Sequence, residues 1–147
     1  TLVTGIYATC STSCPLILLE GKALLESLPQ DVLEQLDFVA ISLSPEYDTN
    51  TQMDRIATAY GFEYPMFRYL NGDPGLLNKT TRSLGFSRSV DPESGVINHA
   101  NLFLVLDANG FIAYRLTLDD RHKEWLRQAV ISLAEEIGQK ALATTNR

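Results

Sequence analysis

The chemistry of this sequence centres on two cysteines, Cys10 and Cys14, which are separated by three residues and followed by Pro15. They come after a short apolar run and before a helical pattern, so we expect them at a junction between a strand and a helix. A helix N-terminus favours the thiolate, which is both the nucleophile and the metal ligand of cysteine. A disulfide closing so short a loop would constrain the unfolded chain little compared with a longer bridge. The pair therefore predicts a metal or redox site.

His99 adds an imidazole just before an apolar stretch at residues 101–106. Thiolates select Cu(I), and imidazole suits both copper and zinc. A structural zinc site normally takes four protein ligands, but the sequence has no third cysteine, and its other histidine, His122, begins the last predicted helix. Cys10, Cys14 and His99 are therefore predicted to hold one copper ion, Cu(I) or Cu(II). The alternative for His99 is a histidine satisfied by hydrogen bonds within its loop.

The local sequence patterns predict an alternation of strands and helices around these residues. Segments rich in β-branched and aromatic residues predict strands over residues 1–7, 37–43, 101–106 and 111–116. Helical periodicity and capping signals predict helices over residues 15–28, 50–60, 74–84 and 120–139. The sequence Asp-Ala-Asn-Gly at residues 107–110 predicts a tight turn, so the last two strands should form an antiparallel hairpin. Residues 62–73 are expected to form an aromatic loop, and residues 86–98 an exposed loop.

This order of elements predicts an α/β, thioredoxin-like fold with a central mixed sheet flanked by helices. The first two strands should be parallel and joined by a right-handed crossover, and the hairpin and a closing helix should follow. In that topology His99 faces the start of the first helix, so it should meet the loop of Cys10 and Cys14 at one end of the sheet. Thioredoxins usually carry a cis-proline near this place, where the present sequence offers an imidazole.

The composition is that of one globular domain over residues 1–147, with 45% hydrophobic and 20% charged residues. No apolar run approaches the roughly 20 residues that a membrane-spanning helix needs. The net charge is −6 and the basic residues are scattered, so nucleic acid is not an expected partner. Because the chain opens directly into apolar residues, we expect an N-terminal segment or membrane anchor ahead of Thr1. Residues 143–147 are expected to be a loose tail.

Three motifs, in order, resemble those of the Sco/SenC family of copper proteins. They are the strand with Cys-x-x-x-Cys-Pro over residues 6–15, Ile-Ser-Leu-Ser-Pro-Glu-Tyr-Asp-Thr over residues 41–49, and Asn-His at 98–99 followed by an apolar strand and its turn. The resemblance runs from residue 3 to residue 118. The family often has Pro-Asp inside the cysteine motif and Asp-Pro after the second strand, where this chain has Ser-Thr-Ser at 11–13 and Ser-Pro at 44–45. Asp48 and Thr49 are interpreted as a helix cap.

The resemblance implies an extracytoplasmic protein that binds copper through Cys10, Cys14 and His99 and is tethered to a membrane by an N-terminal anchor. Its partner would be the copper-site subunit of cytochrome c oxidase or another copper protein. It would assist assembly of the binuclear copper site by metal transfer, thiol reduction or both. The bacterial periplasm is the expected location, with the mitochondrial inner membrane facing the intermembrane space as the alternative.

Two enzymatic alternatives remain open. In a thiol–disulfide oxidoreductase of the cell envelope, Cys10 would attack as the thiolate and Cys14 would be the resolving partner. The Cys-x-x-x-Cys spacing is looser than the Cys-x-x-Cys of such enzymes, and His99 would then have no role. A peroxidase-like thiol enzyme typically needs an arginine near its cysteine, and no spacing places one there from among Arg55, Arg68, Arg82 and Arg88.

Overall fold

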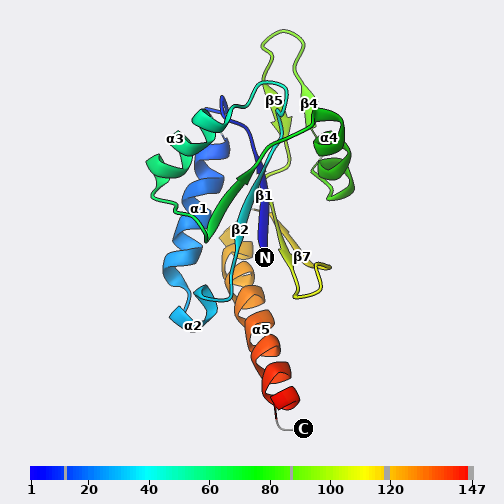
Figure 1. Ribbon diagram of the computed structural model, residues 1–147. Helices are drawn as coiled ribbons and strands as arrows, with labels where there is room; N and C mark the ends of the chain where they lie inside the picture. The colour runs from blue at the N-terminus through cyan, green and yellow to red at the C-terminus, as the bar shows by residue number, and fades with distance from the viewer. Residues whose placement is uncertain (12, 87, 118–119, 146–147) are drawn as a thin grey trace.

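The computed structural model describes residues 1–11, 13–86, 88–117 and 120–145. Strands and helices follow one another along the chain (Figure 1). The strands are β1 (Leu2–Ile6), β2 (Phe38–Ser42), β3 (Phe67–Leu70), β4 (Arg88–Val90), β5 (Ile97–His99), β6 (Leu102–Leu106) and β7 (Ile112–Thr117). The helices are α1 (Ser13–Ser27), α2 (Gln30–Leu33), α3 (Asn50–Tyr60), α4 (Pro74–Ser83) and α5 (Asp120–Thr145).

Five strands form one mixed sheet in the order β3-β2-β1-β6-β7. β1 and β2 are parallel, with Leu2 opposite Phe38, and β3 extends the sheet in parallel on the far side of β2. β6 runs antiparallel to β1, and β7 returns antiparallel to β6 after the tight turn. The parallel pair and the closing hairpin are therefore as predicted. Figure 1 shows α1 and α3 to one side of these strands and α4 to the other, which confirms a mixed sheet flanked by helices.

The core is formed where α1 packs onto the middle of the sheet. Every residue of β1 is buried, because this strand has neighbours on both edges. Phe38 and Phe103 are fully buried, with ring centroids 6.1 Å apart. A Cβ atom at Gly21 would lie 2.7 Å from the Phe38 ring, so only glycine lets the helix come this close. This packing fixes the start of α1, where Cys14 lies, relative to the end of β1.

Two segments predicted as loops contain short strands. β3 lies within residues 62–73 and pairs with β2. Residues 86–98 contain β4 and most of β5, which pair as a separate two-stranded antiparallel ribbon with Arg88 opposite His99. These strands have three or four residues each, too few for an alternating pattern to stand out from a loop. The sequence pattern also missed α2, a single turn between α1 and β2.

Helix ends follow the capping signals closely in one case and depart from prediction in another. α3 has its predicted bounds, with a capping box between Thr49 and Gln52 and Gly61 at φ 70° as its C-cap. α5 runs on to Thr145, so residues 143–145 of the predicted loose tail are helical, in keeping with the helix-favouring residues at 140–143. The remaining two, 146–147, lie outside the described residues. No described helix has the length and apolar character needed to cross a membrane.

Candidate metal centre

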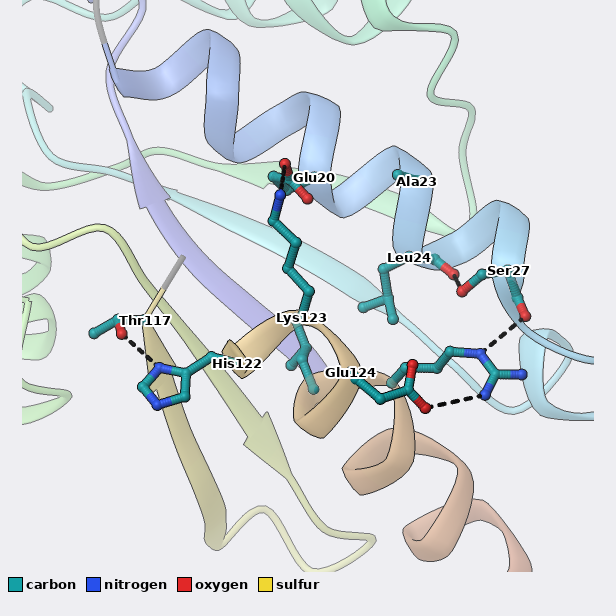
Figure 2. A pocket seen from close by; sticks show the side chains of 10 residues that line it. Glu20, Ala23, Leu24, Ser27, Thr117, His122, Lys123 and Glu124 are labelled. Carbon is teal, nitrogen blue, oxygen red and sulfur yellow. Dashed lines mark hydrogen bonds and ion pairs between the residues drawn. The ribbon is translucent and has the colours of Figure 1, made fainter. Parts of the chain in front are cut away.

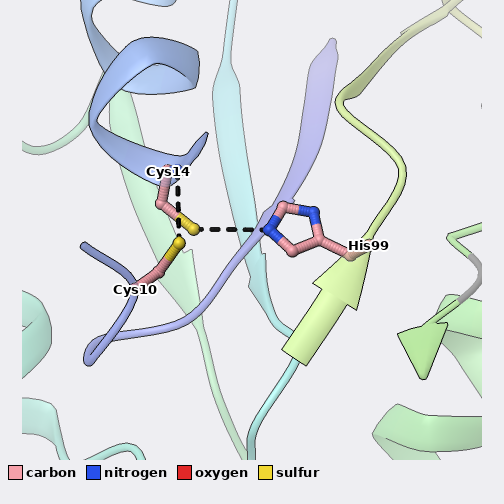
Figure 3. Close-up of side chains that lie close together, drawn as sticks. All are labelled: Cys10, Cys14 and His99. Carbon is pink, nitrogen blue, oxygen red and sulfur yellow. Dashed lines mark hydrogen bonds between the residues drawn. The ribbon is translucent and has the colours of Figure 1, made fainter. Parts of the chain in front are cut away.

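The side chains of Cys10, Cys14 and His99 meet beyond the carboxyl end of β1 (Figure 3). Their two sulfurs and a ring nitrogen all lie within 4.8 Å of one another. The cysteines come from the loop after β1 and the first turn of α1, and His99 is the last residue of β5. Cys14 is buried, with 3% of its surface exposed, whereas Cys10 and His99 are half-buried. The group is therefore open towards solvent on the side of Cys10 and His99.

Cys10 caps the start of α1 with its own sulfur. The backbone N–H of Cys14 donates to the Cys10 Sγ atom over 3.3 Å, and the Cys10 N–H donates to the Tyr7 carbonyl over 3.2 Å. Pro15 fits the first turn because its missing N–H needs no partner there. A sulfur at a helix N-terminus lies near the positive end of the helix dipole. A Cys10 thiolate would be stabilised at this position once a metal ion or a partner has displaced its proton.

Cys14 is held in the opposite electrostatic environment. Burial raises the pKa of the Cys14 thiol far above its ordinary value of 9.0, and the hydrogen bond with Cys10 raises this pKa further. The physical cause is that apolar surroundings disfavour the charged thiolate. At neutral pH, Cys14 keeps its proton, which a metal ion would have to displace.

The imidazole of His99 is oriented by its backbone neighbour. Its Nδ1 atom lies 3.3 Å from the Ala100 carbonyl oxygen, which can only accept, so Nδ1 carries the proton. The Nε2 atom then presents a lone pair towards Cys14 Sγ at 3.5 Å and Ser13 Oγ at 3.3 Å. A histidine with one nitrogen fixed by a carbonyl and the other free to bind is the usual form of a metal-binding imidazole.

Tyr7 connects the cysteine loop to the strand that carries His99. Its hydroxyl donates to the Ile97 carbonyl over 3.2 Å, and its ring meets the His99 ring edge to face with centroids 5.8 Å apart. Burial is the main cause that raises the pKa of Tyr7 to about 12, so the phenol stays a neutral donor at physiological pH. Tyr7 thus ties β5 to the end of β1 and keeps the imidazole beside the thiols.

Asp48 is a site residue whose role the sequence analysis did not predict. Thr49 alone caps α3, whereas the buried Asp48 carboxylate points back to the cysteine loop. It accepts hydrogen bonds from the Ala8 backbone N–H at 2.9 Å, the Ser42 hydroxyl at 2.5 Å and the Tyr69 hydroxyl at 3.1 Å. Asp48 therefore ties the loop that holds Cys10 to β2 and β3. The sequence did offer a signal for this role of Asp48. The residue follows the second strand and directly precedes Thr49, which is sufficient by itself to cap α3.

One of the four arginines considered for a peroxidase-like site lies on the strand beside His99. Arg88 belongs to β4 and pairs in register with His99. Its guanidinium donates to the Leu43 carbonyl and lies 3.7 Å from a Glu46 carboxylate oxygen. These contacts hold the β4–β5 ribbon against the loop after β2. They give the Arg88 guanidinium a structural role.

His122 lies in a separate groove between α1 and α5 (Figure 2). The groove has a volume of about 230 Å³. The His122 Nδ1 atom is 2.6 Å from the Thr117 hydroxyl, and the Lys123 ammonium is 2.8 Å from a Glu20 carboxylate oxygen across the groove. Among the described residues, His122 does not join the group of Cys10, Cys14 and His99.

A family model for SCO1/SenC matches residues 1–134. The chain belongs to the SCO1/SenC family. No curated protein matches it by sequence. The family that the sequence motifs indicated is thereby confirmed, over nearly the whole length of the chain.

Solved structures of SCO1/SenC proteins share the fold. A copper-bound ScoI of Bradyrhizobium japonicum is 24% identical with a TM-score of 0.73, covering 90% of this chain and 83% of that one. A SCO1/SenC family lipoprotein of Bacillus anthracis is 19% identical with a TM-score of 0.75, covering 90% and 80%. BsSco, described with a disulfide switch as a member of the Sco family of cytochrome c oxidase assembly proteins, is 18% identical with a TM-score of 0.71, covering 91% and 79%. At these identities the likeness shows the thioredoxin-like fold.

Proposed function

We propose that this protein binds one copper ion through the sulfurs of Cys10 and Cys14 and the Nε2 atom of His99, and serves assembly of the copper site of cytochrome c oxidase. The observation that carries the proposal is the gathering of these three donor atoms within 4.8 Å. They come from two separate parts of the chain, and the imidazole lone pair is directed at a thiol. The copper-bound relative and the family of oxidase assembly proteins support the choice of metal and role.

The donor set fits copper by its chemistry. Two thiolates and one imidazole are soft and intermediate ligands that suit Cu(I), whereas a closed structural zinc site uses four protein ligands. In the described part of the chain, no carboxylate or further histidine joins the three residues. Copper is cargo in this role, so a site of three ligands that is open on one side suits exchange with a partner.

The exposure of the ligands suggests how cargo would leave. Cys10 and His99 are half-buried and face the open side, whereas Cys14 is buried behind them. Ligands of a receiving protein could replace Cys10 and His99 first, and Cys14 would be the last ligand to dissociate from the ion. Each released thiolate takes a proton back from water, and the high pKa of Cys14 favours that final step.

A second candidate function is thiol–disulfide exchange, favoured by the position of Cys10 at the helix N-terminus. The Cys10 thiolate would attack a disulfide of the partner, and Cys14 would then lose its proton and displace the partner's sulfur. The partner would gain two electrons and end as a dithiol, while Cys10 and Cys14 would end as a disulfide. BsSco is described with a disulfide switch, which is in keeping with this chemistry.

We place this activity outside the cytoplasm, in the bacterial periplasm, with the chain tethered through a segment ahead of Thr1. The Bacillus anthracis relative is described as a lipoprotein, which supports a tether of this kind. The partner we propose is the copper-site subunit of cytochrome c oxidase, with another copper protein of the same compartment as the alternative.

An anaerobic competition titration tests the function. The reduced protein is titrated with Cu(I) against a chelator, beside the His99→Ala and His122→Ala variants. One equivalent should bind, and His99→Ala should weaken binding at least about tenfold, because it removes a ligand. His122→Ala is the matched control and should bind as the wild type does. Equal binding by all three proteins would contradict the three-ligand site, and disulfide reduction by the metal-free His99→Ala variant would favour thiol exchange.

A further inference from the structure

Ser13 places a hydroxyl inside the metal centre. It is the first residue of α1 and directly precedes Cys14. Its Oγ atom lies 3.3 Å from His99 Nε2 and 3.7 Å from Cys10 Sγ. The side chain is half-buried, so the hydroxyl is enclosed by the same residues that form the candidate site. A hydroxyl held between a sulfur and an imidazole can act on both.

In the metal-free protein the Ser13 hydroxyl donates its hydrogen bond to His99 Nε2. Nδ1 carries the ring proton because it faces the Ala100 carbonyl, so Nε2 can only accept. The neighbours of Nε2 are the Ser13 hydroxyl at 3.3 Å and the Cys14 thiol at 3.5 Å. A hydroxyl is the stronger donor, because S–H donates weakly. The Ser13 oxygen can then accept from a Cys10 thiol, because either atom of this 3.7 Å pair can be the donor.

Loading of the site changes both neighbours of this hydroxyl. The Nε2 lone pair is then engaged and can no longer accept a hydrogen bond. Cys10 releases its proton to solvent, and its sulfur becomes an anionic acceptor. The Ser13 O–H group therefore loses His99 Nε2 as its acceptor and gains the Cys10 thiolate, which is a stronger acceptor. Only a rotation about the Cβ–Oγ bond of Ser13 is required.

We propose that Ser13 is a positioning residue whose hydroxyl caps His99 Nε2 in the empty site and turns to the Cys10 sulfur when copper is held. This inference rests on the proposed copper site. A hydrogen bond to a metal-bound thiolate withdraws electron density from the sulfur and tunes the redox balance of the metal. Because Cu(II) depends more on thiolate donation than Cu(I) does, the Ser13 hydroxyl favours retention of Cu(I).

The test uses the whole chain and three variants. Ser13→Ala removes the hydroxyl, Ser13→Thr restores one, and Ser11→Ala is the matched control at an exposed serine of the same loop. Each protein is loaded with Cu(II) to record the thiolate-to-copper charge-transfer band. The Cu(I) and Cu(II) affinities are then measured by chelator competition, and a Cu(I) stoichiometry of one shows that each variant has kept the site.

We expect Ser13→Ala to shift the band to longer wavelength and to raise the ratio of Cu(II) to Cu(I) affinity about threefold to tenfold. A tenfold change corresponds to a reduction potential lower by about 59 mV for this one-electron couple. Ser13→Thr should return both values towards those of the wild type, and Ser11→Ala should leave both unchanged.

Three results would overturn the assignment. A Ser13→Ala band and affinity ratio equal to those of wild type would show that the hydroxyl does not bond to the thiolate. Loss of all copper binding in Ser13→Ala would make the oxygen a ligand rather than a donor. Absence of a thiolate-to-copper band from the wild type, together with no Cu(I) binding, would overturn the copper site itself. That last result is distinct, because it does not depend on residue 13.

Discussion

At the scale of single residues, the two cysteines differ in what surrounds their sulfurs. Cys10 accepts a backbone N–H at a helix N-terminus and is half-buried, whereas Cys14 is almost wholly buried. The first environment stabilises a thiolate and the second stabilises a thiol. The pair therefore combines one sulfur that a partner can reach, that of Cys10, with one that is buried, that of Cys14.

The thiol of Cys14 should make the metal-free protein sensitive to alkaline pH. Below its ordinary pKa of 9.0, the thiol is protonated in both the folded and the unfolded chain, so its contribution is constant. Above that pH the unfolded thiol ionises while the folded one does not, because its pKa is raised, and stability falls. We expect a loss of about 1 kcal/mol from this group between pH 8 and pH 10.

Urea unfolding under reducing conditions at pH 8, 9 and 10 measures this loss. The Cys14→Ala variant should be less stable at every pH, because it leaves a void, but its stability should fall less steeply as the pH rises. The same steepness in the variant and the wild type would show that the folded Cys14 thiol ionises normally.

At the scale of elements, the site depends on how the loop after β1 is tied to its neighbours. The Asp48 carboxylate fixes Ala8 from the side of β2, and Tyr7 fixes β5 from the side of β1. Neither residue supplies a donor atom to the group of three. They position two loops so that a helix start and a strand end present their ligands together.

Asp48→Ala should therefore weaken both the fold and the site. It leaves three donors at Ala8, Ser42 and Tyr69 without their carboxylate, so we expect a loss of about 2–3 kcal/mol in the free energy of unfolding. Cu(I) affinity should fall as well, because the loop that holds Cys10 is released. Urea unfolding and chelator competition measure the two effects.

Thr49→Ala is the matched control at the neighbouring residue. It removes the cap of α3, so it should cost about 1 kcal/mol, while its Cu(I) affinity should remain that of the wild type. An Asp48→Ala variant that behaves like Thr49→Ala in both measurements would show that Asp48 acts on the helix alone.

Elements with a strong local signal were predictable, and those that depend on distant partners were not. α3 has its predicted bounds because its cap, its C-terminal glycine and its periodicity agree. β3 lies in an aromatic segment whose strand character comes from pairing with β2, which the local sequence does not encode. The β4–β5 ribbon is bounded by turn-forming residues that outweigh its short strands.

The meeting of Cys10, Cys14 and His99 was predictable because topology alone brings two chain segments to the same end of the sheet. The contacts around them were not predictable in the same way. Ser13 and Asp48 are polar residues next to stronger signals, a cysteine and a helix cap, and only the three-dimensional structure gives the direction of their side chains. Sequence spacing therefore indicates the donor atoms, whereas the residues that orient them need coordinates.

At the scale of the whole molecule, binding at this site should stabilise the fold. The ligands lie on α1, on the loop after β1 and on β5, so a bound ion would link parts of the chain that separate on unfolding. A ligand at one hundred times its dissociation constant adds about 2.7 kcal/mol to the stability of the folded state. For a chain of this size, that corresponds to a rise of roughly 5–10 °C in Tm.

Thermal unfolding in a Cu(I) buffer, with and without the metal, tests this linkage. Wild type and His122→Ala should show the rise, and His99→Ala should show a much smaller one at the same free copper concentration. An equal rise in His99→Ala would indicate that copper stabilises the chain through another site.

The central claim is that two sulfurs and one imidazole hold the ion. X-ray absorption at the copper edge of the Cu(I)-loaded protein measures this directly, because it distinguishes sulfur from nitrogen neighbours. We predict two sulfur neighbours and one nitrogen neighbour in the wild type, with the nitrogen lost in His99→Ala and one sulfur lost in Cys10→Ala. A copper ion without sulfur neighbours, or a spectrum unchanged by His99→Ala, would contradict the site.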